Sequence, residues 1–295
     1  MSPAGPAEHR FRVATWNVNS LRARGEALGR FLDRACPDVL CLQETKATDL
    51  DTQAAATLER AGYQTAHVGR GGYNGVAIAS RHAITRSEAS GGIGDEHLDR
   101  EPRLISCLIE IPVPLRLVSL YVPHGRRIGD PHFQYKLAFL DSLANHVTRW
   151  LRDGNLIVAG DVNVAATDSD IFHPDAFVGL THVTPAERAA WRGVLDAGLV
   201  DVDVARWGPR ARRFTWWNYG IGYSRNLGMR LDVIAADHAL ASTVDTTWID
   251  HVERDTDRPS DHASLIADFD LTRLPRASNR VVPSTGAIQT ESSAS

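Results

Sequence analysis

The chain has 295 residues, of which 43% are hydrophobic and 23% charged, and its formal net charge is −4. This composition excludes a disordered or fibrous protein, and the length suits one α/β domain. The negative charge excludes a uniformly basic DNA binder, but it allows a local basic face beside an acidic, metal-binding pocket.

Short apolar and β-branched runs predict eight strands, at residues 12–16, 39–42, 76–79, 104–111, 115–122, 156–159, 231–235 and 264–269. Helical spacing of apolar residues predicts helices at 25–35, 50–61, 132–151 and 185–197. Thr184 would cap the last of these, with Pro185 at its first position. Strands and helices alternate early and strands follow one another at 104–122, which favours a layered α/β fold with mixed sheets.

Both ends of the chain differ in composition from this core. Residues 1–10 are rich in Pro and Ala, and residues 273–295 are rich in Ser, Thr and Ala. We expect two flexible tails around a single domain at residues 11–272. The start of the chain lacks an apolar signal core and no run approaches the roughly 20 apolar residues that cross a bilayer, so we expect a cytoplasmic protein without membrane contact. Nothing in the sequence demands more than a monomer.

The cysteines give no indication of a disulfide framework. Their number is odd, and two of the three lie inside apolar runs that are predicted to be strands: Cys36, Cys41 and Cys107. We expect them to behave as small core residues rather than as reactive thiols.

Polar residues stand at the edges of the predicted strands. Each lies at or just beyond the C-terminal end of an apolar run: Asn17, Glu44, Tyr121, Asp161, Asn163, Asp232, Asp261 and His262. Carboxylates gathered on one rim of a sheet repel one another unless a cation or a proton separates them. Hard cations such as Mg²⁺ prefer oxygen ligands and often contact substrate phosphate. The pattern therefore predicts a phosphoryl-transfer site.

Each of these residues also has an ordinary structural role. Asn17 could occupy a turn after a strand, and Glu44 could simply be exposed. Gly160 allows a tight turn, after which Asp161 and Asn163 point to the same side if the chain stays extended, but they also fit an Asx turn. The Asp-His pair before the last strand could serve loop hydrogen bonding.

The order of the segments is more specific than any one of them. The chain contains, in sequence, TWNVNSLRAR, DVLCLQETK, GYNGVAIAS, LVSLYVPHGR, VAGDVNVA, FTWWNY, GMRLDVIAAD and PSDHASL. This series closely resembles the exonuclease III branch of the endonuclease/exonuclease/phosphatase superfamily, from about residue 11 to about residue 270. The resemblance implies a four-layer αββα sandwich in which two mixed sheets pack face to face with helices outside.

The resemblance also implies an activity. We expect a metal-dependent DNA repair phosphodiesterase: an exodeoxyribonuclease III that acts as an abasic-site endonuclease and trims blocked 3′ ends of duplex DNA in base excision repair. The implied cofactor is Mg²⁺, with Mn²⁺ as an alternative, as one or two ions. The implied metal ligands are Asn17, Glu44, Asp161, Asn163, Asp261 and His262.

The implied catalytic roles involve five residues. Asp161 would activate the attacking water and Asn163 would orient it. Asp232 would hold the His262 imidazole in one tautomer, and His262 would contact the scissile phosphate as its charge grows. Tyr121 would contribute its hydroxyl to the phosphate or to the leaving oxygen.

The implied DNA-binding residues are Asn74, Arg103, Arg126 and Trp216. An aromatic side chain at Trp216 would fill the space of a missing base or enter the minor groove, although Trp216 and Trp217 could both be core residues. Arg103 could instead be a salt-bridge partner. Further candidates for a basic face, which could equally be ordinary surface arginines, are Arg127, Arg210, Arg212 and Arg213.

Three residues depart from the pattern of the branch. His124 stands where Asn or Gln is more common, Asn218 where Asp is usual, and Gly220 where Arg is frequent. These departures leave open how activity divides among abasic-site cleavage, 3′-phosphatase, 3′-phosphodiesterase and exonuclease reactions. Two rivals are a phosphatase of small or lipid-like phosphates, which the tryptophan loop and the arginines disfavour, and an inactive damage binder, which the complete set of site residues disfavours.

Overall fold

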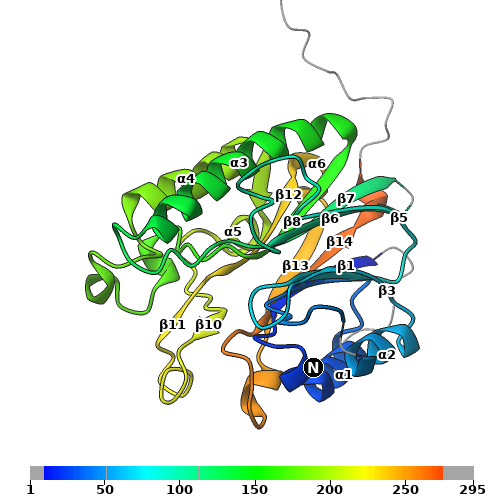
Figure 1. Cartoon of the computed structure of the whole chain (residues 1–295), viewed down its shortest axis with the longest axis horizontal. Helices are drawn as coiled ribbons and strands as arrows, with labels where there is room; N and C mark the ends of the chain where they lie inside the picture. The colour runs from blue at the N-terminus through cyan, green and yellow to red at the C-terminus, as the bar shows by residue number, and fades with distance from the viewer. Residues whose placement is uncertain (1–9, 51, 112, 275–295) are drawn as a thin grey trace, which may run out of the picture.

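In the computed structural model, which describes residues 10–50, 52–111 and 113–274, the apolar runs form two six-stranded mixed sheets (Figure 1). The first sheet contains, in spatial order, β13 (Val244–Asp250), β14 (Ser264–Asp270), β1 (Arg10–Asn17), β2 (Val39–Gln43), β4 (Val76–Ser80) and β3 (Gln64–Val68). The second contains β5 (Ile84–Ala89), β6 (Leu104–Glu110), β7 (Pro114–Tyr121), β8 (Asn155–Asp161), β12 (Asp232–Asp237) and β9 (Leu199–Asp201). A separate ribbon joins β10 (Trp216–Trp217) to β11 (Gly228–Met229).

Helices cover the outer faces of both sheets. α1 (Gly25–Ala35) and α2 (Thr52–Arg60) pack on the first sheet, and α3 (Pro131–Asp153) and α4 (Pro185–Asp196) pack on the second (Figure 1). Two short helices are α5 (Val202–Trp207) and α6 (His238–Ala241), and the 3-10 helices are Arg22–Arg24, Asp168–Asp170, Pro174–Phe177, Val252–Asp255 and Leu271–Arg273. The predicted four-layer αββα sandwich is confirmed.

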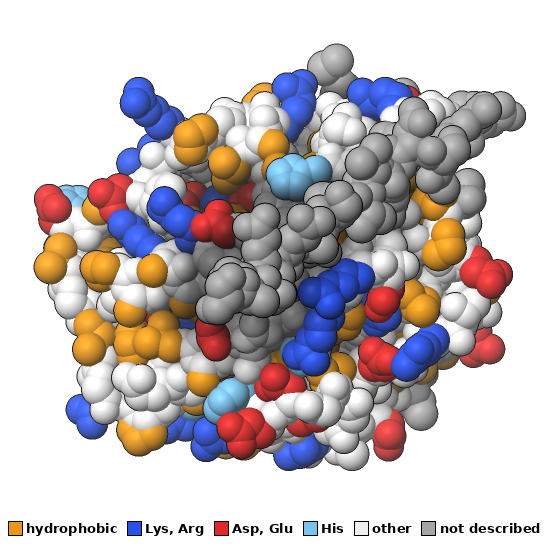
Figure 2. Space-filling model, turned by 90° about the horizontal axis from the view of Figure 1, so that it is seen from above, with side chains coloured by type: hydrophobic (Ala, Val, Ile, Leu, Met, Phe, Trp, Pro, Cys, Tyr) orange, Lys and Arg blue, Asp and Glu red, His pale blue; other side chains and the backbone are white. Residues whose placement is uncertain are grey.

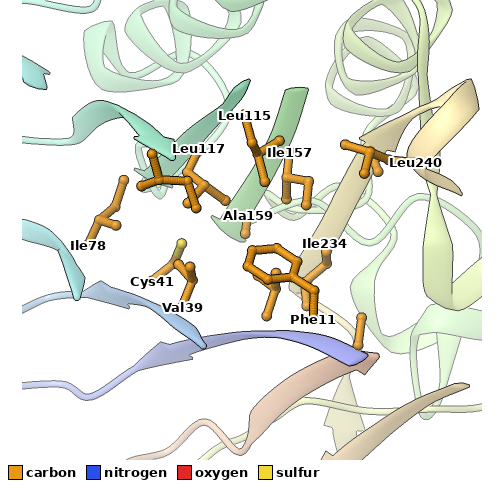
Figure 3. Packing of buried hydrophobic residues seen from close by; sticks show 14 of the residues in the cluster. Phe11, Val39, Cys41, Ile78, Leu115, Leu117, Ile157, Ala159, Ile234 and Leu240 are labelled. Carbon is orange, nitrogen blue, oxygen red and sulfur yellow. The ribbon is translucent and has the colours of Figure 1, made fainter. Parts of the chain in front are cut away.

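The inner faces of the sheets meet in an apolar core. Figure 3 shows Val39, Cys41 and Ile78 of the first sheet opposite Leu117, Ile157 and Ala159 of the second. All three cysteines are free thiols, and Cys41 and Cys107 lie in this core as predicted. The prediction was wrong for Cys36, which is partly exposed because it follows the end of α1. Alternation along each strand sends one set of side chains into this layer and the other under the helices.

The eight predicted strands and four predicted helices are all present, with small shifts at their ends. The Thr184 hydroxyl accepts a hydrogen bond from the Glu187 amide, and Pro185 follows at the first helical position. The sequence prediction missed β3, β5, β9, β10, β11 and β13. Three of these, β3, β5 and β13, are edge strands with largely half-buried or exposed side chains, and the other three have only two or three residues, so their apolar pattern is weak.

The described residues also bear on the predicted tails and surface. Arg10 belongs to β1, Arg273 belongs to the last 3-10 helix and Leu274 packs against the core, so the folded part extends by one residue at the start and two at the end. Residues 1–9 and 275–295 of the predicted tails lie outside the described residues. Within the part of the chain that the structure describes, no helix has the length and apolar character of a membrane span. On the face shown in Figure 2, acidic and basic side chains are interspersed.

Candidate active site

Four strands bring the predicted polar residues to one rim of the sandwich. β1 runs parallel to β2, and β7 runs parallel to β8, so Asn17, Tyr121 and Asp161 end their strands on the same side. Asp232 pairs directly with Asp161 across β12 and β8.

The position of three residues relative to their strands differs from the sequence prediction. Asp232 begins β12, and Asp261 and His262 precede β14, so none of them stands at a strand's C-terminal end. They reach the same rim because β12 is antiparallel to β8 and β14 is antiparallel to β1. An isolated bridge between Trp216 and His262 joins the β10–β11 ribbon to this rim.

The Asn17 amide links two carboxylates. Its Nδ2 atom donates to Glu44 Oε1 at 2.9 Å and to Asp161 Oδ2 at 3.0 Å. Glu44 follows β2 with φ +50°, and its Oε2 atom lies 2.9 Å from Lys46 Nζ. Burial would raise the pKa of Glu44, but the Asn17 hydrogen bond and the Lys46 charge outweigh it and lower that pKa. Glu44 is therefore an ionised carboxylate at the edge of the site.

A buried chain of charges runs from Asp232 through His262 to Asp161. His262 Nδ1 lies 2.7 Å from Asp232 Oδ2, and His262 Nε2 lies 3.6 Å from Asp161 Oδ2. Asp232 Oδ1 is buried and has no hydrogen-bond partner within the described structure. Nδ1–H donates to the Asp232 carboxylate, which orients the ring so that Nε2 is directed at Asp161 and the cavity.

Burial sets unusual proton affinities in this chain. It raises the pKa of Asp161 to about 7, and Asp232 and Glu44 add to the effect, while His262 and Asn17 oppose it. For His262 burial alone would lower the pKa, but Asp232 and Asp161 outweigh it and raise that pKa to about 10. Near neutral pH, Asp161 is poised to gain or lose a proton beside a charged imidazole.

A cavity of about 410 Å³ opens over this cluster. It is lined by Glu44, Tyr121, His124, Arg126, Arg127, Asp161, Asn163, Phe177, Gly179, Leu180, Thr181, His182, Trp216, Met229, Leu231, Asp261 and His262. The Tyr121 hydroxyl hydrogen-bonds Glu44, and burial followed by the Glu44 and Asp161 charges raises its pKa well above the usual value. Tyr121 therefore remains a protonated donor.

The segment around Gly160 and Asn163 has a different geometry from the predicted one. Gly160 lies within β8, where a Cβ atom would sit 1.9 Å from the Leu120 carbonyl oxygen, so it permits the close approach of β7 rather than a turn. Asn163 has φ +51°, and its backbone N–H donates to Asp161 Oδ1 at 2.9 Å. The chain is thus not extended here. Asp161 and Asn163 therefore form the Asx turn of the structural interpretation, and both also line the cavity, as the functional interpretation requires.

The donor set at the rim resembles a site for a hydrated hard cation more than a closed metal cage. Among the residues that the structure describes, no three His, Cys, Asp or Glu side chains converge as a ready-made metal cluster. Mg²⁺ binds through one or two carboxylates and keeps several waters, whereas structural zinc requires four protein ligands. Glu44 and Asp161, whose pKa is raised, are two carboxylates at the cavity and fit the pattern of Mg²⁺ binding.

Asp261, which directly precedes His262 and lines the cavity, is held by hydrogen bonds from its neighbours. Its Oδ1 accepts from Asn19 Nδ2 at 2.9 Å and its Oδ2 from Trp216 Nε1 at 3.0 Å. Burial would raise its pKa, but the His262 charge and these hydrogen bonds lower it. Asp261 thus anchors the ring of Trp216 at the cavity wall.

The predicted DNA-binding residues separate into two groups. Trp216 and Arg126 line the cavity, whereas Trp217 is buried in the core. The alternative that these tryptophans are core residues thus holds for Trp217 but not for Trp216. Arg103 is buried, pairs with Glu101 at 2.6 Å and stacks on the Tyr121 ring. Asn74 Nδ2 donates to the same Glu101 carboxylate at 3.0 Å. Arg103 and Asn74 therefore contact Glu101 and, through Arg103, the ring of Tyr121, and they hold this part of the rim in place.

The other arginines of the predicted basic face do not line this cavity. Arg213 pairs with Asp203 at 3.0 Å, and Arg212 donates to the carbonyl oxygens of Ile171 and Phe172. Arg210 is exposed, and Arg127 alone of this group lies at the cavity. Of the residues that depart from the branch pattern, His124 lines the cavity, and Asn218 and Gly220 are exposed in the loop after β10.

Sequence reasoning missed several residues of the cavity. His182 Nε2 lies 3.2 Å from His124 Nε2, and His182 Nδ1 lies 2.6 Å from the Asn163 carbonyl oxygen. Beneath them Lys136 and Glu187 form a fully buried ion pair at 2.5 Å. Lys46 stands two residues after Glu44 in DVLCLQETK, and Met229 lies in GMRLDVIAAD, so both were detectable from those segments. The segment around His182 has no pattern that indicates the site.

Comparisons with known proteins agree with this geometry. A model of the endonuclease/exonuclease/phosphatase family matches residues 14–262. Exodeoxyribonuclease III of Haemophilus influenzae is 30% identical over 88% of this chain and 99% of its own length. A 3′ phosphatase from Neisseria, solved with a product DNA hairpin, superimposes with a TM-score of 0.82 at 32% identity, covering 88% of this chain and 99% of its own. An AP endonuclease from Archaeoglobus fulgidus gives a TM-score of 0.81 at 33% identity with the same coverage.

Proposed function

The chain belongs to the endonuclease/exonuclease/phosphatase family, and we propose that it hydrolyses phosphate esters in duplex DNA, at abasic sites and at blocked 3′ ends. It is an enzyme, a DNA repair nuclease of the exonuclease III branch. The catalytic unit is a single domain at about residues 10–274, slightly longer than the predicted 11–272, and it acts as a cytoplasmic monomer.

The observation that carries this proposal is the buried Asp232–His262–Asp161 chain at the base of the cavity. A positively charged imidazole held by Asp232 at 2.7 Å presents its other nitrogen to the cavity. Such a fixed charge stabilises negative charge that develops on a phosphate oxygen during displacement. Asp161, with a pKa of about 7, accepts a proton at neutral pH.

The reaction is attack of water on phosphorus with departure of the 3′ oxygen. Asp161 takes the proton from water, Asn163 positions that water, and His262 faces the phosphate oxygens. The Tyr121 hydroxyl stays protonated and donates a hydrogen bond to the departing oxygen, which takes its proton from solvent water. The products are a 3′-hydroxyl and a phosphate monoester, or inorganic phosphate when the substrate is a 3′-phosphate end.

The family is metal-dependent, and Glu44 is the first ligand we assign to the ion. Asn17, Asp161, Asn163, Asp261 and His262 complete or flank its position, with Mg²⁺ as the ion, Mn²⁺ as a substitute, and one or two ions in turnover. When bound, the cation neutralises charge on the phosphate. Glu44 is ionised and beside the cavity, as a ligand of Mg²⁺ must be.

The cavity wall favours a nucleotide over a small phosphate ester. Trp216, Met229 and Leu231 form an apolar side next to the catalytic residues, and Arg126 and Arg127 line the mouth. An apolar wall accommodates a deoxyribose or a base, and arginines accommodate flanking backbone phosphates. We assign DNA contact to Arg126 and Trp216, and a supporting position to Asn74 and Arg103.

The decisive test uses two duplex oligonucleotides, one with a single tetrahydrofuran abasic analogue and one with a 3′-phosphate at a recessed end. Each is incubated with Mg²⁺ or with EDTA. Wild type should incise the first on the 5′ side of the lesion and release phosphate from the second, in both cases only with Mg²⁺. Glu44→Ala and Asp161→Asn should lose both reactions.

Asp245→Asn is the matched control, because this aspartate is exposed and lies outside the cavity. It should retain wild-type rates. Failure of folded wild type to act on either duplex would refute the DNA repair assignment and redirect the search to small phosphate esters.

A further inference from the structure

A tight reverse turn at residues 177–180 forms part of the cavity wall. The Leu180 amide donates to the Phe177 carbonyl oxygen at 2.9 Å. Val178 has φ −55° and ψ 122°, and Gly179 has φ +82°. These angles describe a type II turn, which requires a glycine at its third position. The turn has a defined backbone conformation, and its second residue, Val178, projects from the surface.

The side chains at this turn are apolar, although turn tips usually carry Gly, Pro, Asn, Asp or Ser. Val178 is 80% exposed and Leu180 is 51% exposed. Ile128, which follows β7 and lines the same outer hollow as Val178, is 49% exposed. Single exposed apolar residues are ordinary, but a group of them beside a cavity marks a contact surface.

The turn separates two hollows. Gly179 and Leu180 line the catalytic cavity, and Val178 and Gly179 line a second cavity of about 600 Å³ on the outer side. A nucleotide whose phosphate lies at Asp161 and His262 must place its sugar and base along the remaining walls of the first cavity. The turn is one of those walls.

We propose that the 177–180 turn is a wedge that packs Val178 and Leu180 against the sugar and base next to the hydrolysed phosphate and unstacks that base from its neighbour. This inference rests on the proposed action on duplex DNA. Apolar side chains inserted at base steps are a common means of opening a duplex locally. The rigid turn holds its side chains in place before DNA arrives, so little ordering is required on binding.

The charges near the turn fit this occupant. Arg126 and Arg127 line the catalytic cavity, and neither guanidinium has an ion-pair partner among the described residues. The outer hollow instead carries Asp175, which would repel a backbone phosphate, and Asp168, whose charge is paired with Arg188 at 2.9 Å. The surface on that side of the turn therefore suits a base or sugar rather than the phosphate chain.

The test is a duplex oligonucleotide with 2-aminopurine as its 3′-terminal base, because the fluorescence of this base rises when it unstacks. Binding is measured in EDTA at low salt and hydrolysis in Mg²⁺. Wild type should raise the fluorescence. Val178→Ser with Leu180→Ser, which leaves Gly179 and the turn intact, should bind without that rise. Its kcat/KM on the duplex should fall by about tenfold, equivalent to about 1.4 kcal/mol.

Val252→Ser is the control, since Val252 is also exposed, at 50%, and lines neither hollow. It should match wild type in both measurements. Equal fluorescence and equal kcat/KM in the double variant and wild type would overturn the wedge. A double variant that differs from wild type only in self-association, measured by sedimentation, would overturn it as well. Wild type that hydrolyses the duplex without raising fluorescence would overturn the wedge alone, and wild type that hydrolyses no duplex would overturn the proposed function with it.

Discussion

Two buried charged clusters lie at the cavity, the catalytic one at its base and the structural one behind its wall, and they are built differently. In the structural cluster, Lys136 Nζ contacts Glu187 Oε1 at 2.5 Å and the Asn163 carbonyl oxygen at 2.6 Å. The Glu187 carboxylate also accepts hydrogen bonds from Thr181, from the His182 amide and from Thr184. In the catalytic cluster, Asp232 Oδ1 has no hydrogen-bond partner in the described structure, and His262 stands 3.6 Å from Asp161.

The difference shows that burial of charge alone does not identify an active site. A cluster whose charges all have partners resists any change in protonation, and this is how a structural ion pair behaves. A cluster that holds two carboxylates and an imidazole against one cavity, with an incomplete set of partners, changes protonation readily. Four experiments test this distinction.

The largest expected effect is that of Asp161→Asn on catalysis. Loss of a general base lowers kcat by about 10² to 10⁴. The folded-state pKa of Asp161 is raised from 3.8 to about 7, so this group costs stability as pH rises from 3.8 to about 7, and the loss stays constant above that. The variant should therefore be at least as stable as wild type at pH 8 in urea unfolding. A clear loss of stability would mean that Asp161 is a structural charge.

Lys136→Met should have the opposite profile. Removing one partner of a buried ion pair leaves Glu187 unpaired, which destabilises the fold by about 3–5 kcal/mol. Urea unfolding measures this loss, and adding Glu187→Gln should restore part of it. If the single variant keeps wild-type stability but loses hydrolysis, the two clusters have been assigned the wrong way round.

Acid unfolding should depend on the structural cluster. Burial would raise the pKa of Glu187, but Lys136 and the hydrogen-bond donors outweigh it and lower that pKa to about 2. A depressed carboxyl pKa contributes stability that is present above about 4.5 and is lost as pH falls toward 2. The free energy of unfolding should fall by about 2–3 kcal/mol between pH 5 and 2 through this group. Glu187→Gln should show a correspondingly flatter pH profile, and an unchanged profile would contradict the assignment.

The smallest expected effect is stabilisation by the metal. Mg²⁺ at a free concentration tenfold above its Kd should stabilise wild type by about 1.4 kcal/mol. Glu44→Gln should lose this gain while keeping the metal-free melting temperature, because Glu44 lies at the edge of the cavity. Calorimetry with Mg²⁺ and with EDTA measures both values. An equal gain in the variant would place the ion on other ligands.

Several features of the fold and site were predictable from local sequence. The eight inner strands and four long helices carry strong apolar periodicity, and Thr184–Pro185 marks the start of α4 with chemistry that acts within one turn. Asn17, Glu44, Asp161 and His262 lie in motifs whose order resembles that of the family. Weak edge strands such as β3 and β5 escaped because partial exposure dilutes their pattern.

Other features arise only when distant segments meet. The predicted strand-end rule failed for Asp232 and His262 because strand direction, which the sequence does not encode locally, brings the start of β12 to the end of β8. The pKa of Asp161 depends on burial by residues far along the chain, and Arg103 turned inward to Glu101 and Tyr121. Sequence determined which residues are chemically able to act. Tertiary packing decided which of them share one cavity, because distance and desolvation exist only in the folded chain.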